Sequence, residues 1–268
     1  MKHKKDNKLK ITILTENVAG GQFLAEHGLS YLLEIDNEQI LFDTGHSDVF
    51  LKNAERLGLD IKKEVNTVVL SHGHWDHGDG LRFIDNKTLI THPASFLKRY
   101  RKADNSTVGL ALSKDEIQNK FKLIESKNQY KLAENLFFLG EIPRINNFES
   151  KTTTFKLENE KDDFIDDDSA LVAIINKELI VITACSHSGI CNICEHAKTV
   201  TGIEKISAVI GGFHLKRNNL QTQKTVAYFK KNAVKRVLPS HCTELPALTV
   251  FYDNFEIQQI KTGMTFEF

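Results

Sequence analysis

The chain has 268 residues, and its 35 lysines and arginines balance its 35 aspartates and glutamates. This net charge of zero argues against a general binder of nucleic acid, because such binding depends on uncompensated cations. Apolar residues make up 41% of the sequence, which is enough for a substantial core and excludes a disordered chain. The 11 histidines are the unusual feature, because imidazole binds metals and titrates near neutral pH.

The N-terminus and the cysteines indicate a compartment. Residues 2–10 are rich in lysine, but only the short apolar run ITIL follows, whereas a secretory signal needs a longer one. We therefore interpret residues 2–10 as a soluble tail, and no other stretch has the length of a membrane span. Three of the four cysteines (Cys185, Cys191 and Cys194) lie close together, unlike a secreted disulfide framework. The sequence thus predicts a protein of the reducing cytoplasm.

The first part of the chain alternates strands with helices. In residues 47–58, apolar side chains recur at helical spacing behind a polar cap, which predicts a helix. A basic helix is predicted over residues 95–102. The predicted strands are ITILTEN, YLLEID, QILFDTG, NTVVLSH and TLITH.

Residues 103–167 are less regular, with one helix-like piece, KDEIQNKFKLI, before a charged stretch. This segment is either an exposed loop or hairpin, or a lid over a functional site. The second half then repeats the earlier style, with helices over residues 191–200 and 219–233 and the strands ALVAI, LIVITACSH, SAVIGGFH and VKRVLPSH. Two similar α/β halves without a linker fit two packed sheets with helices outside.

The segment VVLSHGHWDHGDG carries the strongest functional signal. An apolar strand ends there, and His72 and His74 follow two positions apart, so an extended backbone points them the same way. Asp76 and His77 are adjacent and converge only through a turn, which the flanking glycines permit. Three imidazoles and a carboxylate within six positions are typical of a zinc site. The alternative is a polar loop of hydrogen-bonded histidines, whose charged forms would repel one another.

Three further histidines stand where apolar strands stop. His187 follows LIVITACS, His214 follows AVIGGF, and His241 follows RVLPS. Strand ends at one edge of a sheet are where ligands from distant parts of a sequence can converge. Each histidine alone would be an ordinary loop residue, but their shared context predicts one site.

The histidine segment resembles the HxHxDH signature of the metallo-β-lactamase superfamily, and Asp43-Thr44-Gly45 resembles that superfamily's first motif. The pieces EHGLSYLLE, LFDTG, ACSHSGI, GGFHL and PSHCT extend the resemblance to the metal-dependent hydrolases of β-lactamase superfamily II. That group includes relatives that join a dihydropterin to a ribofuranosyl-aminobenzene phosphate. The resemblance implies one α/β domain over residues 1–268, an αββα sandwich of two mixed sheets with outer helices, in which residues 103–167 form an insertion or lid.

The resemblance also implies metal ligands. The ligands expected for a first ion are His72 and His74, and those for a second ion are Asp76, His77 and His241. His187 follows the strand after which the superfamily places a carboxylate that bridges the ions, and we expect it to bind the first ion. A neutral imidazole cannot bridge as a carboxylate does, so the second ion would be weaker or absent. The remaining family ligand would fall near residues 166–169, where we interpret Asp167 and Asp168 as an exposed acidic run rather than as ligands.

Two residues are assigned to the surroundings of the metal. Asp43 is expected to orient a ligand histidine by accepting a hydrogen bond, without touching metal. His214 either binds metal or contacts the substrate, where it would polarise a carbonyl or phosphate oxygen.

Several side chains are candidates for binding substrate. Lys216 and Arg217 directly follow His214, although both also fit a solvated helix start. His92 ends a predicted strand and has either a pocket or a structural role. Further candidates for phosphate contacts are Lys98, Arg99 and Arg101.

The pair Cys191 and Cys194 forms a lone CxxC. An Fe–S site needs four well-placed thiolates, and Cys242 is far away in the sequence. Because the pair falls on one face of a predicted helix, we interpret both as packing residues.

The implied chemistry is hydrolysis of a small carbonyl or phosphoryl substrate by a metal-bound hydroxide, with Asp76 and His214 as catalytic residues. The cofactor is one or two divalent ions, zinc foremost, with manganese or iron as alternatives. Alternative functions are a transferase that joins a dihydropterin pyrophosphate to a ribofuranosyl-aminobenzene phosphate, a phosphodiesterase, and a non-hydrolytic redox or metal-binding protein. We expect a small-molecule partner, phosphorylated or pterin-like, and neither nucleic acid nor membrane. The oligomeric state stays open, with a homodimer as one possibility.

Overall fold

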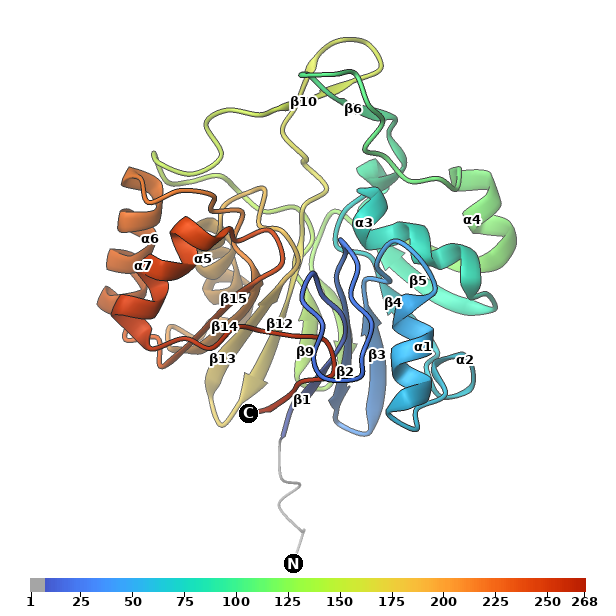
Figure 1. Ribbon diagram of the computed structural model, residues 1–268, viewed down its shortest axis with the longest axis horizontal. Coiled ribbons are helices and arrows are strands. Elements are labelled where there is room, and N and C mark those ends of the chain that lie inside the picture. Colours follow the sequence, from blue (N-terminus) through green and yellow to red (C-terminus); the bar gives the residue numbers. More distant parts are fainter. Residues whose placement is uncertain (1–7) are drawn as a thin grey trace, which may run out of the picture.

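Two β-sheets packed face to face form the centre of the computed structural model, which describes residues 8–268 (Figure 1). His3 and the first part of the predicted tail lie outside the described residues. Helices cover the outer face of each sheet, so the four layers follow the predicted αββα order. Among the described residues, no helix is both long and apolar enough to cross a bilayer.

The first sheet collects strands from the N-terminal part and one from the C-terminus. In spatial order it contains β16 (Thr265–Glu267), β1 (Lys10–Thr15), β2 (Ser30–Ile35), β3 (Glu38–Phe42), β4 (Thr67–Val69), β5 (Lys87–Thr91) and β7 (Phe121–Glu125). Its accompanying helices are α1 (Val49–Arg56), α2 (Ile61–Glu64), α3 (Trp75–Gly78), α4 (Lys114–Lys120), and the 3-10 helices η1 (Asp79–Phe83) and η2 (Pro93–Phe96).

The second sheet comes from the C-terminal part. In spatial order it contains β15 (Arg236–Ser240), β14 (Ile206–Gly212), β13 (Glu178–Thr183), β12 (Ala170–Ile175), β9 (Leu136–Phe138) and β8 (Tyr130–Ala133). Helices α5 (Ile190–Thr201), α6 (Leu220–Lys231) and α7 (Leu245–Phe255) pack on its outer face. Strands β13, β14 and β15 are parallel, so their C-terminal ends lie at one edge.

The strands are apolar on both faces because both faces are buried. In β2, Tyr31 and Leu33 belong to the core between the sheets, whereas Leu32 belongs to the core under α1. Successive side chains of a strand point to opposite faces, so a strand packed on both sides needs a continuous apolar run. The same rule explains the apolar segments that predicted β12, β13 and β14.

Residues 103–167 are divided among three sheets. Strand β7 extends the first sheet, and β8 and β9 extend the second. A small third sheet joins β11 (Asp162–Asp163), β10 (Phe155–Leu157) and β6 (Arg99–Arg101), and β6 and β10 stand above the main strands at the top of Figure 1. Only the third sheet and its flanking loops therefore have the placement expected of a lid.

The predicted basic helix over residues 95–102 is wrong. The chain forms the short η2, capped by His92, and then runs extended through β6. Pairing with β10 satisfies the backbone of residues 99–101, and the Arg99 side chain is fully buried. Sequence periodicity contains no information about that distant strand.

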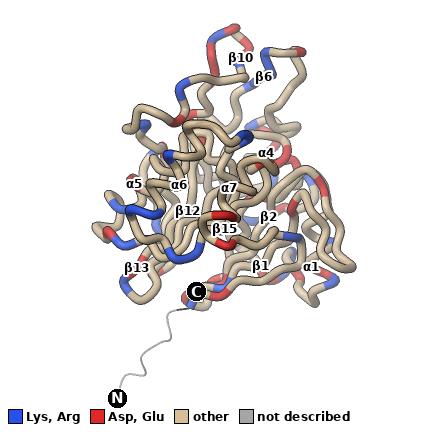
Figure 2. The backbone as a smooth tube through the Cα atoms, turned by 60° about the vertical axis from the view of Figure 1, so that its left-hand side comes forward, with Lys and Arg blue, Asp and Glu red and all other residues tan. Residues whose placement is uncertain are grey.

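Charges of both signs are interspersed over the surface (Figure 2). Across the third sheet, Lys98 pairs with Glu158 at 3.0 Å and Lys102 with Asp162 at 2.8 Å. The balance of charge seen in the composition is thus also local.

Candidate metal centre

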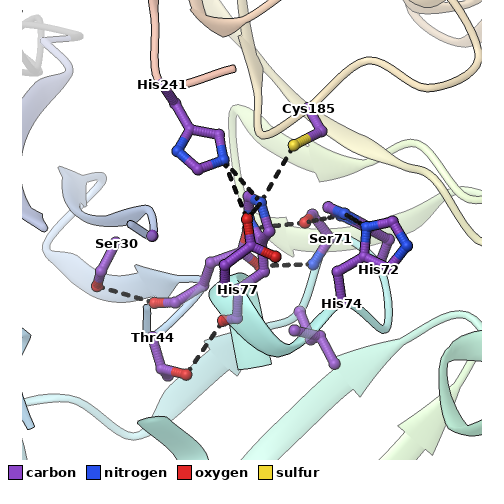
Figure 3. Close-up of polar contacts among 12 residues, drawn as sticks. Ser30, Thr44, Ser71, His72, His74, His77, Cys185 and His241 are labelled. Carbon is purple, nitrogen blue, oxygen red and sulfur yellow. Dashed lines mark hydrogen bonds and ion pairs between the residues drawn. The ribbon is translucent and has the colours of Figure 1, made fainter. Parts of the chain in front are cut away.

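The histidines expected as ligands converge at the edge where strands of both main sheets end, and Figure 3 shows His72, His74, His77 and His241 of this set. The turn after β4 supplies His72, His74 and His77, and the loops after β13, β14 and β15 supply His187, His214 and His241. Segments far apart in the sequence meet here because each follows the carboxyl end of a neighbouring strand.

We define the first half-site as His72, His74 and His187. One ring nitrogen of each lies within 4.8 Å of the others, and His72 Nε2 is 3.1 Å from His74 Nδ1. The Nε2 atom of His187 is buried and has no hydrogen-bond partner among the described residues. A buried polar atom without a partner is costly, so this nitrogen is available to bind a cation.

We define the second half-site as Asp76, His77 and His241. The Nε2 atoms of the two histidines are 3.1 Å apart. Asp76 Oδ2 lies 3.6 Å from His77 Nε2 and 3.5 Å from His241 Nε2. The two half-sites have the membership that the family resemblance implies, and their occupation by metal stays a prediction.

Hydrogen bonds that Asp43 accepts fix the orientation of His77 directly and of His72 through Ser71. Asp43 Oδ2 accepts bonds from His77 Nδ1 and from Ser71 Oγ, each at 2.7 Å. Because Ser71 Oγ donates to Asp43, it accepts from His72 Nδ1 at 2.8 Å. Both rings therefore carry a proton on Nδ1 and present Nε2 to the centre, the arrangement that metal-binding histidines need.

His241 is held by the segment after β1. Its Nδ1 donates to Asn17 Oδ1 at 3.1 Å, and Asn17 Nδ2 donates to the His241 carbonyl, also at 3.1 Å. The buried Glu16 carboxylate accepts the His241 backbone N–H. In consequence His241 Nε2 also faces inward.

These donors fit a divalent cation. Two imidazole lone pairs 3.1 Å apart repel each other unless a proton or a cation lies between them. Nitrogen ligands of one tetrahedral zinc ion are about 3.3 Å apart, given Zn–N bonds of about 2.0–2.1 Å. A mixed set of imidazoles with one carboxylate suits zinc and also other first-row ions.

Burial dominates the electrostatics of the first half-site. It lowers the pKa values of His72, His74 and His187 well below the ordinary value, and neighbouring histidines reinforce the effect. His77 behaves oppositely: burial lowers its pKa, but the carboxylates of Asp76 and Asp43 outweigh this and raise it to about 9.

We expect the metal-free protein to be most stable near pH 6.5. Below this pH, His72, His74 and His187 bind protons in the unfolded chain but stay neutral in the folded protein. The free energy of unfolding therefore falls as the pH falls. Above it, the unfolded chain loses a proton that His77 retains up to about pH 9, so stability falls as pH rises. Urea unfolding of the chelator-treated protein from about pH 5 to about pH 9 measures this. His187→Asn should flatten the acid side, and a monotonic profile would contradict the assignment.

Asp43→Asn is expected to weaken metal binding about 10–100-fold, the usual effect of losing a partner that orients a ligand histidine. An amide has one acceptor oxygen, whereas Asp43 accepts three bonds through both oxygens, from His77 and twice from Ser71. Zinc competition with a chromogenic chelator measures the affinity. Glu149→Gln, which alters a buried carboxylate at the start of α5, is the matched control. Equal affinities of the two variants would refute the role of Asp43.

The loop between His72 and His74 requires a glycine and a buried ion pair. A Cβ on Gly73 would lie 1.8 Å from the Ser95 carbonyl oxygen. The Gly73 N–H donates to Asp167 Oδ2 at 2.7 Å, and Arg99 binds both oxygens of Asp167, at 2.8 and 3.0 Å. This network fixes the backbone that carries both histidines.

The interpretation of Asp167 and Asp168 as an exposed acidic run is wrong, since both are fully buried. Asp167 neutralises Arg99, and Asp168 accepts the Ser188 N–H at 2.8 Å, beside His187. Burial raises the pKa of Asp168 to about 6. Neither carboxylate belongs to a half-site, so both support the loops instead of replacing a ligand.

Four residues of the centre have strained backbones. The non-glycine residues with φ between 50° and 58° there are Asp43, Ser186, His214 and His241. Such conformations cost about 1–3 kcal/mol each and persist where the surrounding structure imposes them, often at functional sites.

Two adjoining cavities open beside the half-sites. One, of about 200 Å³, is lined by His74, Asp76, His187, His241 and their neighbours. The other, of about 240 Å³, lies along residues 150–155. Phe155, His187, His214 and Lys216 line both.

The basic candidates for substrate binding separate in the structure. Lys216 lines both cavities, and Arg101 lines the cavity beside the half-sites. Arg99 instead forms buried ion pairs with Asp163 and Asp167, and Lys98 forms a surface ion pair with Glu158. Arg217 is exposed at the approach to α6 and lines neither cavity.

His92 also lines neither cavity. It is buried, and its Nδ1 accepts the Ala94 N–H as the cap of η2. Of the two roles predicted for His92, the structural one therefore fits its position and the pocket one does not.

Sequence reasoning missed Cys185, Ser71 and Asn17. Cys185 is buried with its Sγ 3.2 Å from His77 Nε2. The available signal was its place at the end of the strand that leads to His187. Cys191 and Cys194, in contrast, pack in the apolar core under α5, as interpreted from the sequence.

Comparison with known proteins agrees with this geometry. The sequence model of the metallo-beta-lactamase superfamily matches residues 25–94 of this chain. The chain is 32% identical to the 7,8-dihydropterin-6-methyl-4-(beta-D-ribofuranosyl)-aminobenzene-5'-phosphate synthase of Methanocaldococcus jannaschii, over 99% of this chain and 98% of that one. It is 35% identical to the uncharacterized protein MJ0448 of the same organism, over 89% and 92% of the two chains.

A solved structure shows the same similarity. Tm1679, described as a metal-dependent hydrolase of the beta-lactamase superfamily, aligns with a TM-score of 0.86 and 30% identity over 96% of this chain and 98% of that one. The chain therefore belongs to the metallo-β-lactamase superfamily.

Proposed function

We propose that this protein is a metal-dependent hydrolase of a small carbonyl or phosphoryl substrate. The observation that carries the proposal is the pair of half-sites, with inward-facing nitrogens, beside a cavity. Divalent ions held there would lower the pKa of a bound water and polarise a substrate oxygen.

The residues around the cavity support a small anionic substrate. Arg101 and Lys216 supply positive charge, although Lys216 also pairs with Glu244 at 3.6 Å, and Thr152 and Thr154 line the second cavity. Their combination suits a phosphate group. At about 200 and 240 Å³ the cavities admit a small molecule rather than a polymer.

Two side chains are placed to act on the substrate. His214 lines both cavities, and its buried Nδ1 has no partner among the described residues, so it is free to bind a substrate oxygen. Although burial raises the pKa of Asp76, the nearby His77 and His241 lower it well below its usual range. Asp76 therefore stays ionised and orients the nucleophile rather than storing its proton.

Phe155 shields the first half-site. Its ring lies 4.8 Å from that of His74 and 5.7 Å from that of His187, centroid to centroid. Since Phe155 belongs to β10, the third sheet brings an apolar cover over the metal ligands. This excludes water from one side of the reacting centre.

A transferase is the second candidate. The synthase from Methanocaldococcus jannaschii matches this chain over nearly the full length of both proteins. The same centre would then hold the pyrophosphate of a dihydropterin while a ribofuranosyl-aminobenzene phosphate displaces it.

A single assay distinguishes these functions. The purified protein, with zinc, manganese or iron added separately, is incubated with phosphodiester, phosphomonoester and lactone substrates and with the pterin and aminobenzene pair. Metal-dependent release of a phosphate, alcohol or acid supports the hydrolase. Product formed only from the pair supports the transferase, and metal binding without any turnover contradicts both.

A further inference from the structure

The two half-sites contain little negative charge for two divalent cations. Asp76 is the one carboxylate among the six residues of the two half-sites, and the other five are histidines. Adjacent divalent ions repel strongly in a buried site unless an anion lies between them. A side chain that supplies negative charge between the two half-sites would therefore stabilise two bound ions.

Cys185 is the side chain common to the surrounding ligand groups. Its sulfur lies within 4.8 Å of a nitrogen of His72 and one of His77, which belong to different half-sites. It forms a similar group with His187 and His214, and a third with His241 and Cys242. Cys185 thus reaches both half-sites from one point, and Figure 3 shows its sulfur directed at His77 from the side of His241.

The environment of Cys185 favours a ligand over a packing residue. It is only 3% exposed, and its Sγ lies 3.2 Å from His77 Nε2, the ring nitrogen that faces the centre. His187, whose buried Nε2 has no partner among the described residues, shares one of these ligand groups with Cys185. Cys191 and Cys194, the buried cysteines of α5, instead belong to an apolar core.

We propose that Cys185 is a thiolate ligand shared by the two half-sites. A thiolate sulfur has lone pairs for two ions and suits zinc at about 2.3 Å. On binding, the S–H bond breaks, the sulfur keeps the electron pair and donates it to metal, and the proton leaves to the buffer. This inference rests on the proposed metal centre and adds sulfur to it.

Cobalt(II) is the probe, because a thiolate bound to it gives a strong sulfur-to-cobalt absorption band in the near ultraviolet. The full chain is stripped of metal, titrated with cobalt(II), and analysed for bound ions and for this band. We expect two ions per chain with the band. Cys185→Ser should abolish the band and lower the bound cobalt to one ion per chain, and Cys185→Asp should restore two ions without the band.

Two control variants separate Cys185 from other thiols. Cys194→Ser removes a buried cysteine of the apolar core, and Cys242→Ser removes the neighbouring thiol, whose Sγ lies 3.4 Å from the Cys185 carbonyl. Both should retain the band. A band that persists in Cys185→Ser, or that disappears in Cys242→Ser, overturns the proposal.

The outcome for the wild type distinguishes the two claims. Two cobalt ions without a sulfur band overturn the thiolate ligand and leave the metal-dependent function standing. No bound cobalt overturns both. Circular dichroism of each variant establishes that a lost band does not come from a lost fold.

Discussion

Replacing His74 by alanine is expected to remove the ion of the first half-site and to abolish metal-dependent turnover. His74 is 5% exposed, and its Nδ1 lies 3.1 Å from His72 Nε2. Since one of three imidazoles is lost, we expect affinity to fall by more than the roughly 100-fold that loss of an orienting partner causes. Elemental analysis after dialysis against limiting zinc measures the bound metal.

The matched control for this variant is His196→Ala. His196 lies in α5 and its Nε2 bonds to the Leu139 carbonyl at 3.0 Å, away from both half-sites. It should retain the metal content of the wild type. Full metal content and normal turnover in His74→Ala would defeat the assignment of the first half-site.

Replacing Arg99 by methionine is expected to destabilise the fold by about 3–5 kcal/mol, the typical cost of breaking a buried ion pair. Arg99 is 1% exposed and binds Asp167 through two nitrogens and Asp163 through Nε at 3.1 Å. Without it, two buried carboxylates lose their counter-charge, and the anchor of Gly73 loosens. Urea unfolding measures the loss of stability, and metal affinity should fall with it.

Two further variants make this test specific. Lys98→Met removes the neighbouring surface pair with Glu158 and should leave stability almost unchanged. Arg99→Met combined with Asp167→Asn removes a buried charge from the damaged pair, so the double variant should be more stable than Arg99→Met alone. If Arg99→Met and Lys98→Met unfold at the same urea concentration, the buried network does not support the fold.

Local patterns predicted much of the fold. The predicted strands ALVAI and LIVITACSH are β12 and β13, and the turn between them is at Asn176 and Lys177, which both adopt positive φ. The helix predicted over residues 219–233 is α6, with Asn219 as its cap. These elements depend on neighbours in sequence, so their signals are visible in the sequence itself.

Long-range partners decided the elements that were predicted incorrectly. Residues 95–102 contain helix-compatible side chains, but Arg99 is drawn into the interior by Asp163 and Asp167 and its strand pairs with β10. Similarly, the helix predicted in KDEIQNKFKLI is α4. It ends at Lys120 because Phe121 joins the first sheet beside β5. No periodicity within a window of sequence specifies such pairings.

The same division holds for the candidate site. The spacing of His72, His74 and His77 identified the centre, since three imidazoles in one turn are difficult to explain otherwise. Cys185 was not predicted as a site residue, because only the fold brings its sulfur beside His77. Asp167 was misinterpreted for the equivalent reason, because its partner Arg99 is distant in the sequence.

The most direct test is a crystal structure of the zinc-loaded protein with anomalous scattering recorded at the zinc edge. The account predicts two anomalous peaks, one bound by the first half-site and one by the second, with Cys185 between them. Absence of both peaks from a fully zinc-loaded crystal, or zinc bound only at surface side chains, would contradict a metal centre at the strand ends.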